Sequence, residues 1–435
     1  MTAIKHFIAR REHFAKKMQG GVAIIPTAPE RLRNRDAHYP YRFDSYFYYL
    51  TGFKEPEGVL VIIAATDKAP AKHILFCREK DVEREIWDGF RYGPDAAKEK
   101  FGFDEAYAVS ELDKLLPKLM TDQTAVYSAI GQDAIWDQRI IGWVNQVREH
   151  IRRGIQAPTE IKDCRFFLDE MRLIKDAEEL KVMRRAADIS TQAHQRAMRT
   201  TRPDMHEYEV EAELLYTFCK HGAQAPAYTS IVAGGRNACV LHYVENNAEL
   251  KAGDLLLIDA GCELDGYASD ITRTFPVNGK FTSVQKDIYQ LVLNAQQAAI
   301  AKANPGNTWN DPHQAALQVL AQGFIDLGLC QGSVDAVLES GDYKRFYMHR
   351  TGHWLGMDVH DAGEYKQKGE WRQLQPGMTL TIEPGCYIRP AENVSEHFWN
   401  IGIRIEDDVV ITQTGQELLT AAAPKEIAEI EEIMQ

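Results

Sequence analysis

Short apolar runs alternate with longer polar, alanine-rich stretches over the first part of the chain. The apolar runs cover residues 21–25, 59–63 and 73–77, and each has the length and the β-branched content of a buried strand. The stretches between them have the composition of helices. This alternation predicts an α/β domain over residues 1–173, and no glycine-rich dinucleotide-binding motif accompanies its strands.

A different pattern begins near residue 174. The charged segment 175–179 opens a long amphipathic helix, and apolar positions at helical spacing predict two further helices around residues 284–295 and 316–324. Strand-like runs separate and follow these helices. We therefore predict an α+β domain over residues 174–435 and assign the whole chain to the α+β class.

A hairpin is readable within this second domain. The strand-like run 255–259 ends in Asp259, and Asp265-Gly266 follows as a strong two-residue turn signal, because both residues tolerate a positive φ angle. A turn there sets the pairing of the two strands. Since side chains alternate between the faces of a strand, Asp259 and Asp270 become diagonal neighbours on one face. Two carboxylates held so close repel each other and favour a cation between them.

Three more side chains that could bind a metal ion follow in the sequence: two carboxylates and one imidazole. Glu383 ends a strand-like run where a proline comes next, and residues 401–410 alternate apolar and charged positions, which places Arg404 and Glu406 on one face of a predicted strand. His353 precedes Glu383 and Glu406 in the sequence. Four carboxylates and one imidazole suit Mn²⁺, Co²⁺, Fe²⁺ or Zn²⁺ better than a metal that prefers thiolates.

Each of these residues also has a structural interpretation. Asp259 and Asp270 could be turn or cap residues, Glu406 could pair with Arg404, and His353 could simply pack in the core. The joint pattern favours a metal site, because carboxylates close runs that otherwise look buried, where an unpaired charge is costly.

The composition is that of an ordinary acidic soluble protein. The 435 residues are long enough for two cores, and the formal charge of −13 does not favour nucleic-acid binding. The seven cysteines show no CxxC spacing, which predicts reduced thiols in the cytoplasm. The first residues lack an apolar signal core, and no run is long enough to span a membrane, so we expect neither secretion nor membrane insertion.

Four motifs together resemble one known family. They are Asp259 and Asp270 with ten residues between them, Gly-His-Trp-Leu-Gly-Met-Asp-Val-His-Asp at 352–361, Thr-Ile-Glu-Pro-Gly at 381–385 and Gly-Ile-Arg-Ile-Glu-Asp at 402–407. This set resembles the pita-bread metallopeptidases, and within them the aminopeptidase P type. Residues 39–45 and 48–56 resemble the N-terminal domain of that type. The resemblance implies a pita-bread catalytic domain over 174–435 behind a smaller α/β domain over 1–173.

The resemblance also implies a centre of two divalent metal ions. By the family pattern, Asp270 and Glu406 bridge both ions, Asp259 completes one site, and His353 with Glu383 completes the other. Manganese is the family's usual activator, with cobalt, zinc and iron as alternatives. The two ions would share a water, and the bridging hydroxide would attack the peptide bond.

Matching positions imply a second role for Glu383 and roles for five further residues. Glu383 would also carry a proton from the attacking water to the leaving nitrogen. His242 and His360 would stabilise the oxyanion, although residues 238–243 also read as a strand in which His242 could pack. Arg404 would position substrate or orient Glu406. The remaining two assignments, to the proline pocket, are His349 and Tyr387.

Three functions remain open at this stage. The first is an Xaa-Pro aminopeptidase, which removes the N-terminal residue from peptides with proline in second position. The second is a prolidase that cleaves only Xaa-Pro dipeptides, and the third is a metal-free peptide-binding member of the fold.

Arg350 and Thr351 depart from the small residues usual before the histidine motif. The family's habit implies a homodimer or homotetramer, and its N-terminal domain draws attention to Trp87 and Asp36.

Overall fold

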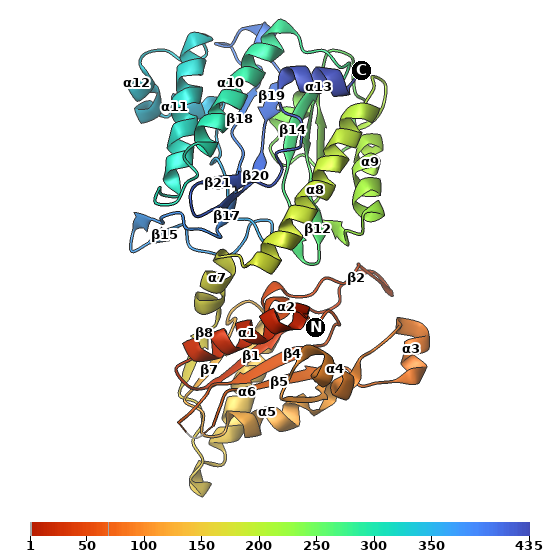
Figure 1. The fold of residues 1–435 in the computed structure, drawn as a ribbon, viewed down its shortest axis with the longest axis vertical. Coiled ribbons are helices and arrows are strands. Elements are labelled where there is room, and N and C mark those ends of the chain that lie inside the picture. The colour runs from red at the N-terminus through yellow and green to blue at the C-terminus, as the bar shows by residue number, and fades with distance from the viewer. Residues whose placement is uncertain (1, 68) are drawn as a thin grey trace. The chain divides into compact units, whose positions relative to one another are not determined.

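The computed structural model describes residues 2–67 and 69–435. Its contacts group the chain into two compact units, Met1–Met171 and Arg172–Gln435. Helices and strands are mixed in both units, which confirms the predicted class (Figure 1). In the described part of the chain, no helix combines the length and the apolar character needed to cross a bilayer.

A six-stranded mixed sheet forms the centre of the first unit. Its order is β6-β5-β4-β1-β7-β8. The strands are β1 (Val22–Pro26), β4 (Val59–Ile63), β5 (Lys72–Cys77), β6 (Glu105–Ala108), β7 (Ala125–Ser128) and β8 (Glu160–Asp163), beside a small hairpin of β2 (Leu32–Asn34) and β3 (Ala37–His38). The three apolar runs became β1, β4 and β5, which confirms those predicted strands.

Helices cover both faces of this sheet. The helices of this part of the chain are α1 (Thr2–Lys17), α2 (Ser45–Thr51), α3 (Val82–Asp88), α4 (Gly93–Phe101), α5 (Leu112–Met120), α6 (Ala134–Arg148) and α7 (Arg165–Leu173). Alternate side chains of β1, β4 and β5 pack against α5 and α6, while α1 and α2 lie on the other face (Figure 1). Trp87 on α3 is 82% exposed, and Asp36 is exposed in the turn between β2 and β3.

Two helix pairs dominate the second unit. The first pair, α8 (Ala177–Thr200) and α9 (Glu207–Lys220), packs against the strands β9 (Ala225–Pro226), β10 (Ile231–Gly234), β12 (Cys262–Leu264) and β13 (Tyr267–Ala268). The helix predicted from residue 175 is α8, and Asp176 and Glu179 form the capping box that starts it. The first sheet of this half has the order β10-β11-β14, with β11 (Leu255–Asp259) and β14 (Thr272–Pro276).

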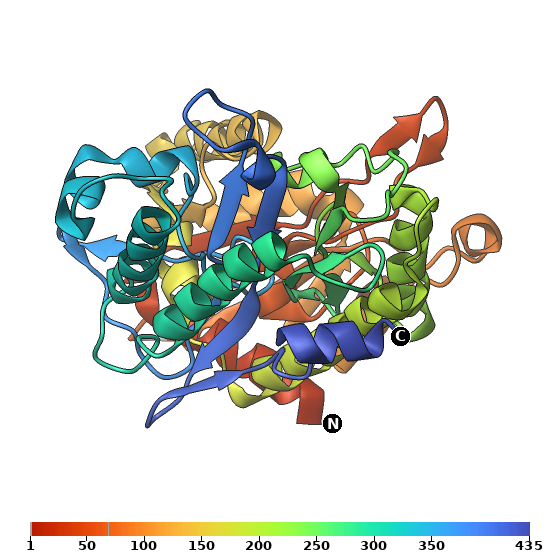
Figure 2. The same cartoon turned by 90° about the horizontal axis from the view of Figure 1, so that it is seen from above.

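The second pair repeats this arrangement. Helix α10 (Ser283–Ile300) packs with α11 (Asn310–Asp326) and against β17 (Thr379–Ile382), β18 (Gly385–Ile388) and β19 (Ile401–Arg404). These two helices confirm the predictions made from apolar spacing. The half also contains α12 (Val334–Ser340), β15 (Lys366–Gln367), β16 (Glu370–Trp371), β20 (Asp407–Ile411) and β21 (Gln416–Leu418), and the last helix α13 (Ile427–Ile433) lies beside α8 (Figures 1 and 2). Two similar halves are what a pita-bread domain requires.

The predicted hairpin forms in the predicted register. Asp265 and Gly266 have φ angles of 49° and 79°, and Leu264 pairs with Tyr267. The same register continues to Asp259, which pairs with Thr272. Between these pairs the two chain segments lie too close together for a side chain at Gly261. A Cβ atom there would lie 1.7 Å from the carbonyl oxygen of Ser269.

Two local predictions were wrong. Residues 401–410 do not form one strand, because β19 pairs with β18 and β20 pairs with β17. The change of sheet falls at Glu406, whose backbone N–H donates to the Thr272 carbonyl at 3.0 Å. Residues 238–243 are not a strand either: a 3-10 helix, Gly235–Cys239, begins at the left-handed Gly235, and His242 lies in the loop after it.

Candidate metal centre

A cavity of about 620 Å³ opens in the second unit, within the size range of small-molecule sites. Nearly all of the predicted site residues line it, drawn from both halves of the unit: Asp259, Asp270, His242, His349, His353, His360, Glu383, Arg404 and Glu406. Tyr387 is fully buried behind this wall, where its hydroxyl contacts His349 and Arg404.

The hairpin positions the first two carboxylates. Asp259 is the last residue of β11, and Asp270 lies in the bend just before β14. A tyrosine that the sequence did not single out joins them: the Tyr228 hydroxyl donates to Asp259 Oδ1 at 2.6 Å and also contacts Asp270 Oδ1. The two side chains therefore share one face, as the register requires.

Residues from the second half complete a cluster of donors. Asp270, His353 and Glu406 each offer an atom that could bind metal, and these atoms all lie within 4.8 Å of one another. His353 Nε2 lies 3.4 Å from Asp270 Oδ2 and 3.7 Å from Glu383 Oε1. Its other nitrogen, Nδ1, is 2.9 Å from the Trp354 carbonyl, a contact that holds the ring with Nε2 toward the carboxylates.

The electrostatics of the cluster suit a cation. Burial, helped by neighbouring carboxylates, raises the pKa of Glu383 to about 7 and the pKa values of Asp270 and Glu406 as well. Burial alone would lower the pKa of His353, but its contacts with Asp270 and Glu383 raise that pKa to about 9. Positive charge is thus favoured among these groups, and their oxygen and imidazole donors fit divalent ions.

Arg404 does not pair with Glu406. Its Nη2 donates to Asp259 Oδ2 at 2.6 Å, and its Nη1 donates to the Tyr387 hydroxyl at 3.0 Å. Glu406 instead accepts a 2.6 Å hydrogen bond from the Thr272 hydroxyl, which itself accepts from Arg404 Nε. The interpretation of Glu406 as a simple ion-pair partner of Arg404 was therefore wrong, and Glu406 keeps an oxygen available in the cavity.

Three histidines extend the cavity wall beyond this cluster. The His349 Nε2 and Tyr387 hydroxyl lie 2.8 Å apart, and burial, together with the charge of Arg404, lowers the pKa of His349 to about 3. The His360 ring lies 4.3 Å from the His353 ring between centroids, and burial lowers its pKa too. His242 is exposed on the same wall.

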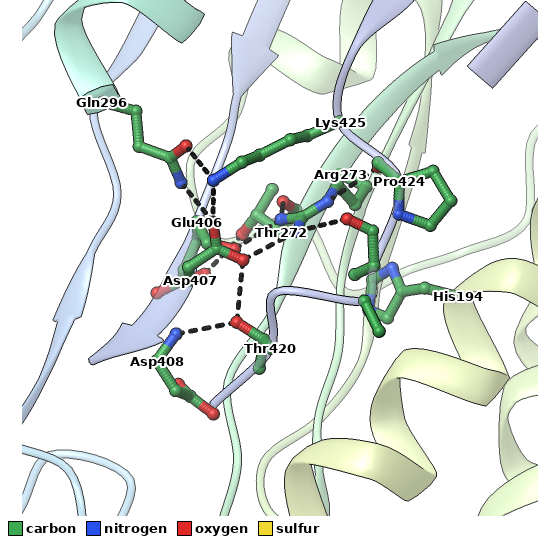
Figure 3. Close-up of polar contacts among 12 residues, drawn as sticks. His194, Thr272, Arg273, Gln296, Glu406, Asp407, Asp408, Thr420, Pro424 and Lys425 are labelled. Atoms are coloured by element: carbon green, nitrogen blue, oxygen red, sulfur yellow. Dashed lines mark hydrogen bonds and ion pairs between the residues drawn. The ribbon is translucent and has the colours of Figure 1, made fainter. Parts of the chain in front are cut away.

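A buried network holds the backbone behind the carboxylates (Figure 3). Asp407 accepts hydrogen bonds from Arg273 Nη2 at 2.7 Å and from Lys425 Nζ at 2.6 Å. Arg273 Nη1 also donates to the Glu406 carbonyl at 2.5 Å. On the next residue, the carboxylate of Asp408 accepts from the Asp270 N–H. These partners lie up to 138 residues apart in sequence. The sequence around Asp407 and Asp408 shows two adjacent carboxylates but does not indicate which residues they contact.

The loop that carries His353 and His360 is anchored in a similar way. Asp361 accepts from Arg172 Nη2 at 2.5 Å and from Lys175 Nζ at 2.8 Å, and all three side chains are about 1% exposed. The two cations lower the pKa of Asp361, although burial alone would raise it. The anchored loop presents both histidine rings to the cavity.

Comparison with known proteins agrees with this geometry. The model of metallopeptidase family M24 matches residues 181–413, and that of the aminopeptidase P N-terminal domain matches residues 7–127. Xaa-Pro aminopeptidase of Escherichia coli is 46% identical over 99% of this chain and 97% of its own length. Human Xaa-Pro aminopeptidase 3 is 34% identical over 94% of this chain and 80% of its own length.

Solved structures resemble the whole chain. Aminopeptidase PepP of Pseudomonas aeruginosa is 50% identical with a TM-score of 0.97, over 99% of this chain and 98% of that one. A zinc-substituted E. coli aminopeptidase P in complex with product is 46% identical with a TM-score of 0.96, over the same shares of both chains. The chain therefore belongs to metallopeptidase family M24, with a pita-bread catalytic domain that follows an aminopeptidase P N-terminal domain.

Proposed function

We propose that this protein is a dimetal-dependent Xaa-Pro aminopeptidase, which removes the N-terminal residue from peptides with proline in second position. The observation that carries the proposal is the convergence of Asp270, His353 and Glu406 in one cavity. The similarity to enzymes named Xaa-Pro aminopeptidase over nearly the full length supports the substrate class.

Five residues would hold the two ions. Asp270 is suited to a place between them, because its Oδ1 faces the Tyr228 hydroxyl shared with Asp259 and its Oδ2 faces His353. Asp259 would then serve one ion, and His353 and Glu383 the other, with Glu406 reaching both. Manganese is our first choice, with cobalt, zinc and iron as alternatives. When bound, the ions would supply a water that ionises near neutral pH and would polarise the substrate carbonyl.

The other side chains would bind substrate and move protons. Glu383 would accept a proton from the water and donate it to the proline nitrogen. His242 and His360 would donate hydrogen bonds to the carbonyl oxygen as its charge develops. His349 and Arg404 line the cavity, and the Tyr387 hydroxyl joins them from behind, so that these three residues would shape the proline pocket.

The wider setting of the enzyme follows the same proposal. We place the catalytic domain at residues 174–435 and the N-terminal domain at 1–173. We infer a homodimer or homotetramer in the cytoplasm, with association through the N-terminal domain. Sedimentation of the purified protein measures its oligomeric state.

The function is tested with metal-stripped protein, assayed without metal and with Mn²⁺, Co²⁺, Zn²⁺ or Fe²⁺ added. The substrates are a tripeptide Xaa-Pro-Yaa, a dipeptide Xaa-Pro and a proline-free tripeptide, and released amino acid is measured. We expect metal-dependent cleavage of the first substrate alone. Cleavage of the dipeptide alone would identify a prolidase, and no cleavage by folded protein with any of the four metals would sink the proposal.

A His242→Ala variant separates catalysis from metal binding. Because His242 is assigned to the carbonyl oxygen and not to the ions, we expect kcat to fall about 10²- to 10³-fold, as for the loss of one oxyanion donor. Metal content, measured by atomic emission, stays at the wild-type level. Loss of the metals in this variant would contradict the assigned role.

A further inference from the structure

One arginine in the cavity wall is not explained by the metal centre. Arg350 lines the cavity three residues before His353, and its side chain is exposed. The other lining arginine, Arg404, donates to Asp259, Tyr387 and Thr272. Among the residues that the structure describes, no carboxylate lies within ion-pair distance of Arg350. It is therefore a fixed positive charge on the wall that has no anionic partner in the described chain.

The guanidinium of Arg350 is held in place from two sides. Its Cζ atom lies 4.7 Å from the centroid of the Trp371 ring, and its Nη2 donates to Asn310 Oδ1 at 2.7 Å. Partial burial against its neighbours lowers its pKa from the usual 12.5, yet an arginine remains charged near neutral pH. A guanidinium carries five N–H donors, and Asn310 occupies one of them.

The backbone at this point is equally well defined. The Thr351 carbonyl accepts from the Glu383 N–H at 2.9 Å, and the Thr351 hydroxyl lies 2.8 Å from His313 Nδ1 and 2.7 Å from the Tyr347 hydroxyl. These contacts hold the chain next to Arg350 against Glu383, which directly follows β17. The arginine is thus preorganised beside the reacting groups, which lowers the entropic cost of using it to bind a ligand.

The charges in the cavity indicate which ligand chemistry Arg350 suits. Four carboxylates line the cavity, and two divalent ions would balance them. Arg350 then leaves a local excess of positive charge on the side of His349, which the proposed function assigns to the proline ring. A substrate group placed there belongs to the part of the peptide that follows the scissile bond. Planar carboxylates match the arginine fork better than any other group in a peptide.

We propose that Arg350 is a specificity-determining residue that binds a carboxylate of the peptide beyond proline. The carboxylate is either the C-terminal group of a tripeptide or an acidic side chain in third position. This inference rests on the proposed function and extends it: the enzyme selects Xaa-Pro peptides that carry a negative charge close to the proline.

The test compares charged and neutral forms of one substrate. For the C-terminal group, kcat/KM is measured with Ala-Pro-Ala and with its C-terminal amide, and for the side chain with Ala-Pro-Glu-amide and Ala-Pro-Gln-amide. We expect the Mn²⁺-loaded wild type to prefer the charged member of at least one pair by about tenfold or more, the range of a charge-assisted hydrogen bond. In Arg350→Gln the ratio falls to about one while the neutral substrates stay within about twofold. Arg350→Lys, which keeps the charge but not the fork, retains part of the preference.

A matched control is Arg345→Gln. Arg345 is an exposed arginine outside the cavity, 3.4 Å from Asp342, and its loss should leave both ratios unchanged. Equal rates on charged and neutral substrates in the wild type, a preference that survives in Arg350→Gln, or loss of activity on every substrate in that variant would each overturn the inference.

Binding without turnover keeps this test separate from that of the proposed function. Calorimetry with the products Pro-Ala and Pro-Ala-amide, and with Pro-Glu-amide and Pro-Gln-amide, reports the same preferences on wild type and Arg350→Gln. A wild type that hydrolyses nothing contradicts the aminopeptidase proposal. A binding preference that disappears with Arg350 would still support carboxylate recognition, and equal binding in both pairs would overturn it.

Discussion

Replacement of Glu406 by glutamine is expected to remove peptidase activity while the fold is retained. Glu406 is the proposed ligand of both ions, and the amide keeps its shape but not its charge. Loss of the metal-activated water removes several kcal/mol of transition-state stabilisation, so we expect kcat/KM to fall by about a thousandfold or more. Metal content, measured on the same protein by atomic emission, should fall below two ions per chain.

Thermal unfolding of the metal-free proteins provides the check on folding. In the metal-free state, burial and the neighbouring carboxylates raise the pKa of Glu406, so its charged form is unfavourable there. Glu406→Gln should therefore unfold at a temperature no lower than that of metal-free wild type. A matched control is Glu417→Gln, since Glu417 is half-exposed on β21 and pairs with Arg184. A fully active Glu406→Gln protein with two bound ions would contradict the role of Glu406 as a metal ligand.

Asp407→Asn is expected to destabilise the catalytic domain strongly. Asp407 and Arg273 have no exposed side-chain surface, and the Lys425 ammonium reaches the same carboxylate. Removal of the one negative charge leaves two cations in a dry site, a change that typically costs about 3–5 kcal/mol. Urea unfolding of the metal-free proteins should show this as a lower midpoint with an unchanged slope.

The control for this variant is an exposed pair in the same domain. Arg184 and Glu417 lie 2.8 Å apart with 47% and 40% of their side chains exposed, so Arg184→Gln should cost less than about 1 kcal/mol. Equal unfolding midpoints for Asp407→Asn and Arg184→Gln would show that the buried network does not stabilise the domain.

Local chemistry explains what could be predicted. The Asp265-Gly266 turn sets the register of its own hairpin, so the common face of Asp259 and Asp270 follows from residues a few positions away. The capping box of α8 is equally local. The place of Glu406 could not be derived in this way, because the chain changes sheets there to reach Thr272, 134 residues earlier.

Long-range contacts account for what was missed. Tyr228 meets Asp259 and Asp270 from a loop 31 and 42 residues before them, with no motif of its own. The interpretation of His242 as part of a strand failed because Gly235 turns the chain with a φ angle of 53°. A single sequence shows the apolar alternation but not which loop a neighbouring strand will meet.

The division of the proposed ligand set between the two halves has a thermodynamic consequence. Asp259 and Asp270 come from the first helix-pair half, whereas His353, Glu383 and Glu406 come from the second. An ion bound by both sets acts as a reversible cross-link between the halves, and it stabilises the native state by mass action. Metal supply then becomes a determinant of how long the protein survives, because chelation releases the cross-link and makes separation of the halves easier.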